Sequence, residues 1–141
     1  IGLRSAVTYE GQAAIELEAL ADPSETGSYP FEISGKTFNP APVWQALLKD
    51  MHSGLSIPRL AARFHNSVVE VNLAICQRVR GISGVNTVVL SGGVWQNRIL
   101  LEKSFHLLTR SGFTVLRHHQ IPTNDGGIAV GQAVVAASEL Q

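Results

Sequence analysis

Two glycine-rich motifs in this chain have the residue types and the positions of an anion site. A Ser-Gly-Gly motif at 91–93 directly follows an apolar run, and an Asn-Asp-Gly-Gly motif at 124–127 directly precedes one. Both fall at predicted junctions with helices, where glycine lets the backbone approach a ligand and free N–H groups favour an anion. Asp125, in the second motif, is placed to face a metal ion or a reacting group. The pair predicts one phosphate-bearing ligand held by two elements of the same sheet.

The first motif permits two interpretations. It is neither a Walker loop, because no Gly-Lys-Ser follows, nor a Rossmann fingerprint, because G-x-G-x-x-G is missing. In the functional interpretation, Gly92 and Gly93 admit a nucleotide and Asn97 forms a hydrogen bond with it. In the structural interpretation, the segment is a tight strand-to-helix turn with Asn97 as the N-cap. The residues alone leave both open.

The second motif is harder to explain by structure alone. An Asn-Asp pair can cap a helix without the glycines that follow, and each glycine in a first helical turn costs about 1 kcal/mol relative to alanine. Close approach of a ligand or of another strand would offset that cost. Asp125 could bind a divalent cation, but a metal site needs three or more ligands. Its neighbours His118 and His119 point to opposite faces of an extended strand, so they do not both join it.

Glu10 and Gly11 form a third candidate site. Gly11 is predicted inside a first helical turn, where glycine is unfavourable unless a ligand approaches closely. Glu10 holding a pair of ribose hydroxyls would explain it. The alternative is a charged helix start favoured by the helix dipole. His65 is interpreted as a structural histidine, and no nucleophile and base arrangement is evident, so no catalytic residue is predicted.

Hydrophobic periodicity predicts the elements that position these residues. A Ser-Gly step at 34–35 predicts a small hairpin between 29–33 and 36–38. The long helix that begins near Ser56 is expected to end at Arg80, before two glycines. The last helix has apolar residues on most sides and is expected to be well buried. The predicted helices cover 9–21, 43–52, 56–80, 97–109 and 125–140, and the predicted core strands cover 87–90 and 113–116.

The order helix, strand, helix, strand, helix after residue 56 is typical of a parallel α/β layer. Ligands in such sheets bind outside the carboxyl ends of the strands. Both glycine motifs follow or face those ends. Topology therefore predicts that Gly92, Gly93, Asn97 and Asp125 lie on one rim.

Composition limits the remaining possibilities. With 141 residues, 45% of them hydrophobic, the chain is expected to form a single domain over 1–141. Eleven basic residues balance eleven acidic ones, which indicates no nucleic-acid partner, and no apolar run is long enough to predict a membrane segment. Cys76 stands alone, as is typical of a reducing cytoplasm. Because the chain begins with Ile1 rather than Met, it is interpreted as a fragment.

Three motifs together resemble the C-terminal end of the hydrogenase maturation carbamoyltransferases of the HypF family. They are Tyr-Glu-Gly-Gln-Ala-Ala at 9–14, Ser-Gly-Gly-Val-Trp-Gln-Asn-Arg at 91–98 and the segment at 122–133 around Asn-Asp-Gly-Gly. The segment Ala-Ala-Arg-Phe-His-Asn at 61–66 is similar to the family's long helix. Trp95 stands where the family pattern has Phe. The Gly-Gly-Val-x-Gln-Asn form distinguishes this family from threonylcarbamoyl transferases and antibiotic O-carbamoyltransferases, whose lobes are the alternative reading.

The resemblance implies the C-terminal lobe of an actin-like ATPase, ribonuclease H-like fold, with a parallel sheet layer, flanking helices and a small N-terminal hairpin. It also implies that carbamoyl phosphate and ATP yield carbamoyladenylate, and that the carbamoyl group passes to the C-terminal cysteine of a HypE-like partner. The implied metal is Mg, Zn or Fe, shared with a preceding lobe, and Asp125 would be one ligand. The implied nucleotide contacts are Gly92, Gly93, Asn97, Glu10, Gly11 and Gly126.

The resemblance places the other half of the site on a lobe that this chain does not contain. The isolated chain should fold but not catalyse, since its metal site and nucleotide cleft would each lack their other half. A third reading is a non-catalytic interaction domain that kept the fold and lost the chemistry.

Overall fold

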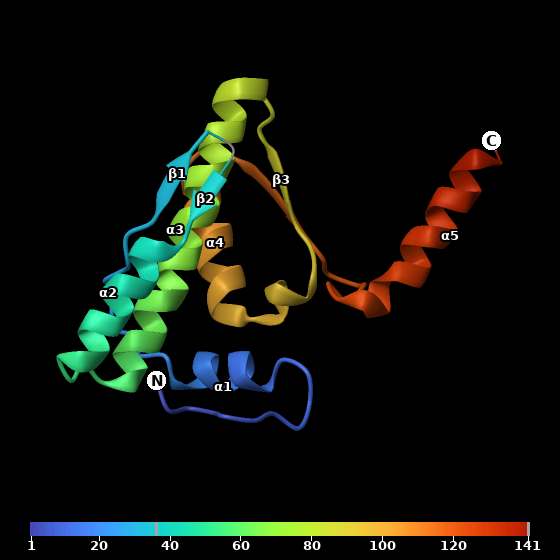
Figure 1. Ribbon diagram of the computed structural model, residues 1–141. Coiled ribbons are helices and arrows are strands. Elements are labelled where there is room, and N and C mark those ends of the chain that lie inside the picture. Colours follow the sequence, from blue (N-terminus) through green and yellow to red (C-terminus); the bar gives the residue numbers. More distant parts are fainter. Residues whose placement is uncertain (36, 141) are drawn as a thin grey trace.

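The computed structural model describes residues 1–35 and 37–140 (Figure 1). These residues form five α-helices, four short strands and two short 3-10 helices. In chain order the elements are α1 (Gln12–Leu20), β1 (Glu32–Ser34), β2 (Thr37–Asn39), α2 (Ala41–His52), α3 (Ile57–Ser83), β3 (Thr87–Leu90), η1 (Gly93–Gln96), α4 (Arg98–Arg110), β4 (Thr114–Arg117), η2 (Asp125–Gly127) and α5 (Ile128–Glu139).

The strands β3 and β4 form the predicted parallel pair. Their register aligns Thr87 with Thr114 and Leu90 with Arg117, so both carboxyl ends lie at the same edge. Leu90, Leu108 and Phe113 form a buried core between this pair and the helices beside it. The predicted α/β class is confirmed, and it brings the segments that follow the two strands together.

A second core lies near the predicted hairpin. The strands β1 and β2 pair antiparallel, and the buried residues Tyr29, Val43 and Leu60 pack together with side chains of α2 and α3. The strand predicted at 36–38 is confirmed at Thr37 and Phe38, whereas Lys36 lies outside the described residues. The long helix α3 contributes to both cores and joins them into one unit.

The helix α3 extends past its predicted end. It continues through Gly81 to Ser83, and Gly84 ends it with a left-handed φ of +73°. A single glycine inside a helix costs only about 1 kcal/mol, which the long hydrogen-bonded helix tolerates. The second glycine supplies the positive φ that a helix C-terminus commonly uses.

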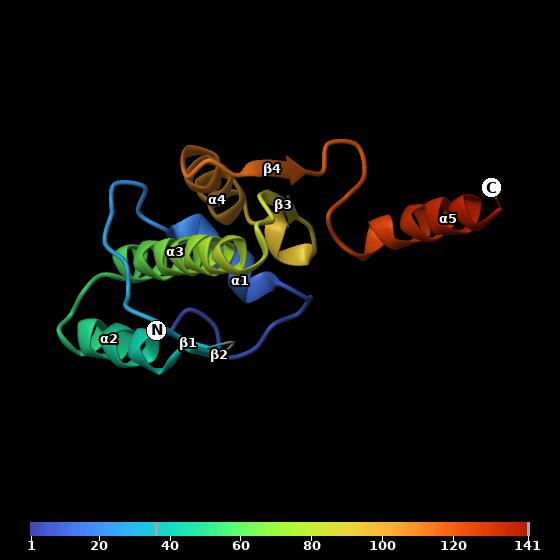
Figure 2. The same ribbon diagram turned by 90° about the horizontal axis from the view of Figure 1, so that it is seen from above.

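The prediction that the last helix is well buried was wrong. No residue of α5 is buried, and Val134 and Val135 are 65% and 59% exposed. Figures 1 and 2 show α5 extending away from the other elements. The helix α5 therefore presents an apolar surface that the other described residues do not cover. Among the described helices, none is long and apolar enough to cross a membrane.

Candidate functional site

An open cleft of about 1300 Å³ lies where α1, α3 and the loops after the parallel strands meet. Five of the seven residues predicted for cofactor or metal binding line it, although they come from three separate parts of the sequence. The other two, Gly92 and Gly126, directly adjoin lining residues. The predicted residues that line the cleft are Glu10, Gly11, Gly93, Asn97 and Asp125.

Two hydrogen bonds join the loops that follow β3 and β4. The N–H of Gly92 donates to the carbonyl of Thr123 at 2.9 Å. The hydroxyl of Ser91 lies 3.0 Å from Nε2 of His118. The two glycine motifs are thus held side by side at the carboxyl edge of the parallel pair, the rim that the topology predicted.

Gly92 and Gly93 differ in what their backbone requires. Gly92 has φ +104° and ψ 161°, a region that essentially only glycine adopts. Gly93 has no such constraint, and a Cβ added there would meet nothing within 4 Å. The N–H groups of Gly93 and Val94 donate no hydrogen bond within the part of the chain that the structure describes. Gly93 therefore leaves space and free donors at the cleft wall.

The glycines of the second motif are explained by the chain itself. A Cβ on Gly127 would lie 2.7 Å from the carbonyl oxygen of Pro122, and one on Gly126 would lie 3.2 Å from Oδ1 of Asn124. That same Oδ1 accepts a hydrogen bond from the N–H of Gly126. The close approach inferred from the sequence is made by the preceding loop, so these glycines do not by themselves require a ligand. Asp125 is exposed at the cleft.

Gly11 also has a conformational explanation. It lies at the N-cap of α1 with φ +78°, not inside the first turn as predicted. A positive φ is a glycine conformation, so no ligand is needed to account for this residue. Glu10, directly before it, is exposed at the cleft.

Asn97 caps α4, as its structural interpretation predicted. Its Oδ1 accepts from the N–H of Leu100 at 2.9 Å, and its Nδ2 donates to Nε2 of His65 at 2.9 Å. Nδ1 of His65 lies 2.8 Å from the carbonyl of Ala61, so Nδ1 carries the proton and Nε2 accepts. His65 is only 3% exposed and is a satisfied structural histidine that fixes Asn97. One amide hydrogen of Asn97 remains for another partner.

Sequence reasoning missed Glu18. Its Oε1 accepts hydrogen bonds from the N–H groups of Arg98 at 2.6 Å and Ile99 at 3.2 Å, across about 80 residues of sequence. A carboxylate from α1 therefore occupies the anion position at the N-terminus of α4. No local pattern pairs these residues, and only the packing of the two helices brings them together.

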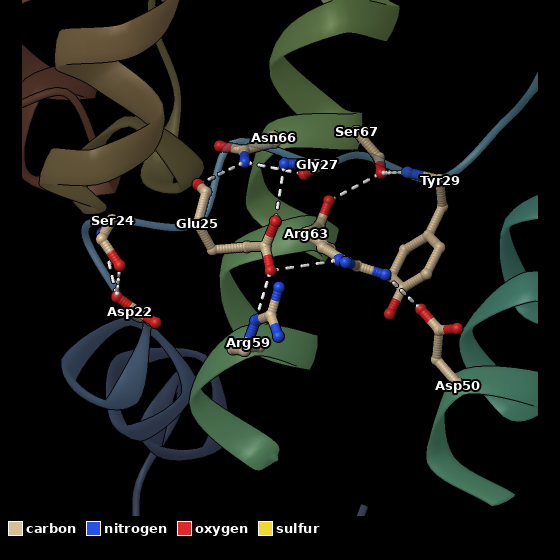
Figure 3. Close-up of polar contacts among 10 residues, drawn as sticks. All are labelled: Asp22, Ser24, Glu25, Gly27, Tyr29, Asp50, Arg59, Arg63, Asn66 and Ser67. Atoms are coloured by element: carbon tan, nitrogen blue, oxygen red, sulfur yellow. Dashed lines mark hydrogen bonds and ion pairs between the residues drawn. The ribbon is translucent and has the colours of Figure 1, made fainter. Parts of the chain in front are cut away.

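A second polar cluster, also missed, lies beside α3 and outside the cleft (Figure 3). The buried carboxylate of Glu25 accepts from the N–H of Gly27 at 2.8 Å and from Nε of Arg59 at 2.6 Å. The Gly27 N–H bond is the main reason that the pKa of Glu25 lies below its ordinary value, and Arg59 and Arg63 add to it.

Arg63 links this cluster to α2. It pairs with Glu25 at 3.4 Å and with Asp50 at 2.7 Å (Figure 3). Burial, with the Asp50 charge second, raises the pKa of Tyr29 to about 12. The cluster fixes the segment between α1 and β1 against α3, which makes it a structural anchor.

The described residues do not form a complete metal site. No group of three or more His, Cys, Asp or Glu side chains gathers anywhere in 1–35 and 37–140. Asp125 alone does not hold a resident ion, because zinc needs three or four protein ligands and Mg²⁺ held by one or two carboxylates also uses substrate phosphates and water. A metal at this cleft would require further ligands from a bound phosphate or from other residues of a longer protein.

The chain matches the family model described as Carbamoyltransferase, Kae1-like Domain, second subdomain, over residues 1–132. It is 38% identical to Carbamoyltransferase HypF of Synechocystis sp. over 100% of this chain, which is 18% of that protein. It is 36% identical to Carbamoyltransferase HypF of Rhodobacter capsulatus over 95% of this chain, which is 17% of that protein.

Solved structures agree with these relatives. Full-length HypF in the phosphate- and nucleotide-bound form superposes with a TM-score of 0.93 at 40% identity, covering 99% of this chain and 19% of that one. HypF of T. kodakarensis, at 22% identity and a TM-score of 0.77, shares the fold over 99% of this chain and 18% of that one. The chain spans less than a fifth of the length of these relatives. By its sequence and its fold, this chain belongs to the HypF carbamoyltransferase family, in which it corresponds to the second subdomain of the Kae1-like domain.

Proposed function

We propose that this chain forms one wall of the ATP site of a HypF-type carbamoyltransferase. The observation that carries the proposal is the convergence of Glu10, Gly93 and Asp125 on one cleft from three distant segments. A structure of a 40% identical HypF is described as phosphate- and nucleotide-bound, which supports the same ligand class here.

The predicted site residues that line the cleft have proposed roles that fit their geometry. The free N–H groups of Gly93 and Val94 face an anion, which suits a phosphate. Glu10, beside the positive-φ Gly11, accepts hydrogen bonds from ribose hydroxyls. The spare amide hydrogen of Asn97 contributes a further polar contact to the nucleotide.

Three residues remain from the predicted set. Gly92 supplies the backbone conformation of the phosphate loop. Gly126 keeps the second loop close to the nucleotide and holds Asp125 at the cleft. Asp125 is proposed as one ligand of a divalent cation whose other ligands lie elsewhere in the full-length protein, where the ion would neutralise phosphate charge.

The full-length reaction is proposed by family membership. Carbamoyl phosphate, ATP and water give carbamoyladenylate, phosphate and pyrophosphate. The carbamoyl carbon is then transferred to the C-terminal cysteine sulfur of a HypE-like acceptor, with AMP leaving and the thiol proton released. The product serves [NiFe]-hydrogenase maturation in the cytoplasm. The residues of this chain contribute nucleotide binding and orientation to that sequence of steps.

Asp125→Ala in the full-length protein tests the proposal. We expect carbamoyl-phosphate-dependent ATP cleavage to fall about 100-fold or more, since ligands and their supporting groups strongly control metal sites. Glu32→Ala removes the same charge from an exposed position of β1 outside the cleft and is the matched control. Undiminished cleavage by Asp125→Ala would instead favour a non-catalytic interaction domain. The 141 residues alone should show no steady cleavage, because the other wall of the cleft is absent.

A further inference from the structure

The helix α1 carries one wall of the cleft but has few buried contacts of its own. Gln12 is its one buried residue among the nine of the helix. The remaining polar contacts near its start join α1 to the chain just before it, through Thr8 with Gln12 and Arg4 with Glu16. Packing against α3, and the bond from the N–H of Asp22 to the carbonyl of Pro58, hold the helix against α3. Neither joins α1 to the segment that follows β3.

Glu18 makes the contact that does. Its carboxylate accepts hydrogen bonds from the first two N–H groups of α4, those of Arg98 and Ile99. Hydrogen bonds from N–H groups to a carboxylate are stronger than those between neutral groups, and the positive end of the helix dipole adds to them. The contact ties α1 directly to the segment that follows Gly93 and Asn97, the opposite side of the cleft.

We propose that Glu18 is the positioning residue that sets the ribose side of the nucleotide cleft against its phosphate side. Glu10 and Gly11 lie two turns before Glu18 at the start of the same helix, and a helix transmits a fixed end to its other end as a rigid rod. This inference rests on the proposed ATP site and adds a specificity determinant to it.

The same contact directs where phosphate binds. Because the carboxylate already satisfies the N–H groups of Arg98 and Ile99, a phosphate is repelled from the N-terminus of α4. The free N–H groups of Gly93 and Val94 are then the donors left for it. Glu18 thus sets the distance between the ribose contact and the phosphate contact.

Three substitutions in the full-length protein test this role. Glu18→Ala removes both acceptors, Glu18→Asp keeps the charge but is too short to reach α4, and Glu18→Gln keeps an oxygen that accepts both N–H groups. We expect Glu18→Ala and Glu18→Asp to raise the Kd for ATP about tenfold and to abolish the preference for ATP over 2′-deoxy-ATP, measured by calorimetry. Glu18→Gln should retain most of the ATP affinity and most of the preference for ATP over 2′-deoxy-ATP. Glu16→Ala, from the same helix but outside the cleft, is the matched control.

Hydrogen exchange gives a readout that needs no nucleotide. Loss of the tether should speed amide exchange both at 98–101 and at 10–20, whereas a purely local cap would affect only the first. Exchange confined to 98–101, or Glu18→Ala with unchanged or tighter ATP affinity, would overturn the inference. If the wild-type protein itself binds no ATP, the proposed function fails, while the exchange pattern still decides whether Glu18 positions α1.

Discussion

At the scale of single residues, the glycines of this chain divide into those the backbone demands and those it does not. Gly92 needs its φ of +104°, Gly11 needs +78°, and Gly127 avoids the carbonyl of Pro122. Gly93 has ordinary backbone geometry and empty space where a Cβ would lie. Among the glycines that line or adjoin the cleft, Gly93 is therefore the one whose absent side chain is best explained by a ligand.

Alanine at two adjacent glycines should give opposite results. Gly92→Ala should lower the free energy of unfolding by about 1–3 kcal/mol, because alanine is strained in that conformation. Gly93→Ala should leave unfolding within about 0.5 kcal/mol of wild type but weaken ATP binding in the full-length protein, since its methyl group occupies ligand space. Urea unfolding and calorimetry measure the two effects. Full ATP affinity in Gly93→Ala would contradict the assignment of this wall to the nucleotide.

At the scale of elements, polar side chains as well as apolar packing attach the segment between α1 and β1 to the helices. The carboxylate of Glu25 fixes the segment between α1 and β1 to α3 by accepting a hydrogen bond from Arg59. The side-chain amide of Asn66 donates to the carbonyls of Glu25 and Gly27. The hydroxyl of Ser67 accepts from the N–H of Tyr29 (Figure 3). The helix α1 is attached to α4 through Glu18 in the same way. The position of the segment between α1 and β1 therefore depends in part on the carboxyl group of Glu25.

Acid should weaken the attachment through Glu25. The folded-state pKa of this carboxyl is lowered, chiefly by the Gly27 N–H and then by its arginines. Its contribution is thus complete above the ordinary glutamate pKa of about 4.3 and is lost as pH falls through the lower folded value. Glu25→Gln should lower unfolding free energy by about 1–3 kcal/mol at pH 7 and flatten the stability loss below pH 4.3. The role would be refuted if urea unfolding showed the same loss of unfolding free energy below pH 4.3 in the variant as in the wild type.

At the scale of the whole molecule, this chain exposes apolar surfaces on its parallel strand pair and on its last helix. Val89 and Leu116 are aligned neighbours on the parallel pair and are 60% and 51% exposed. The apolar helix α5 has no buried residue. The family description names this part a second subdomain, and we expect the rest of the Kae1-like domain to pack on these two surfaces.

A charge introduced on α5 should change the stability of the 141-residue chain and of the full-length protein by different amounts. Val134→Asp should leave unfolding of the 141-residue chain within about 0.5 kcal/mol of wild type, because the side chain is exposed there. In the full-length protein it should destabilise by about 2 kcal/mol or more, as an unpaired charge would be buried. Gln132→Asp, exposed on another face of the helix, is the control. Thermal unfolding of both lengths measures the difference, and equal small effects in both would contradict coverage of α5.

The sequence by itself determined the family, the order of the elements and the rim on which the two glycine motifs meet. These follow from motifs, hydrophobic periods and the rule that parallel strands share their carboxyl edge, all of which are local or topological. The tertiary structure decided which residues hold that rim together. The contacts of Glu18 with α4, of Pro122 with Gly127 and of Asn97 with His65 depend on packing between segments, which no local period encodes. The exposure of α5 was misjudged for the same reason: composition shows that a helix is apolar, but only the fold shows what covers it.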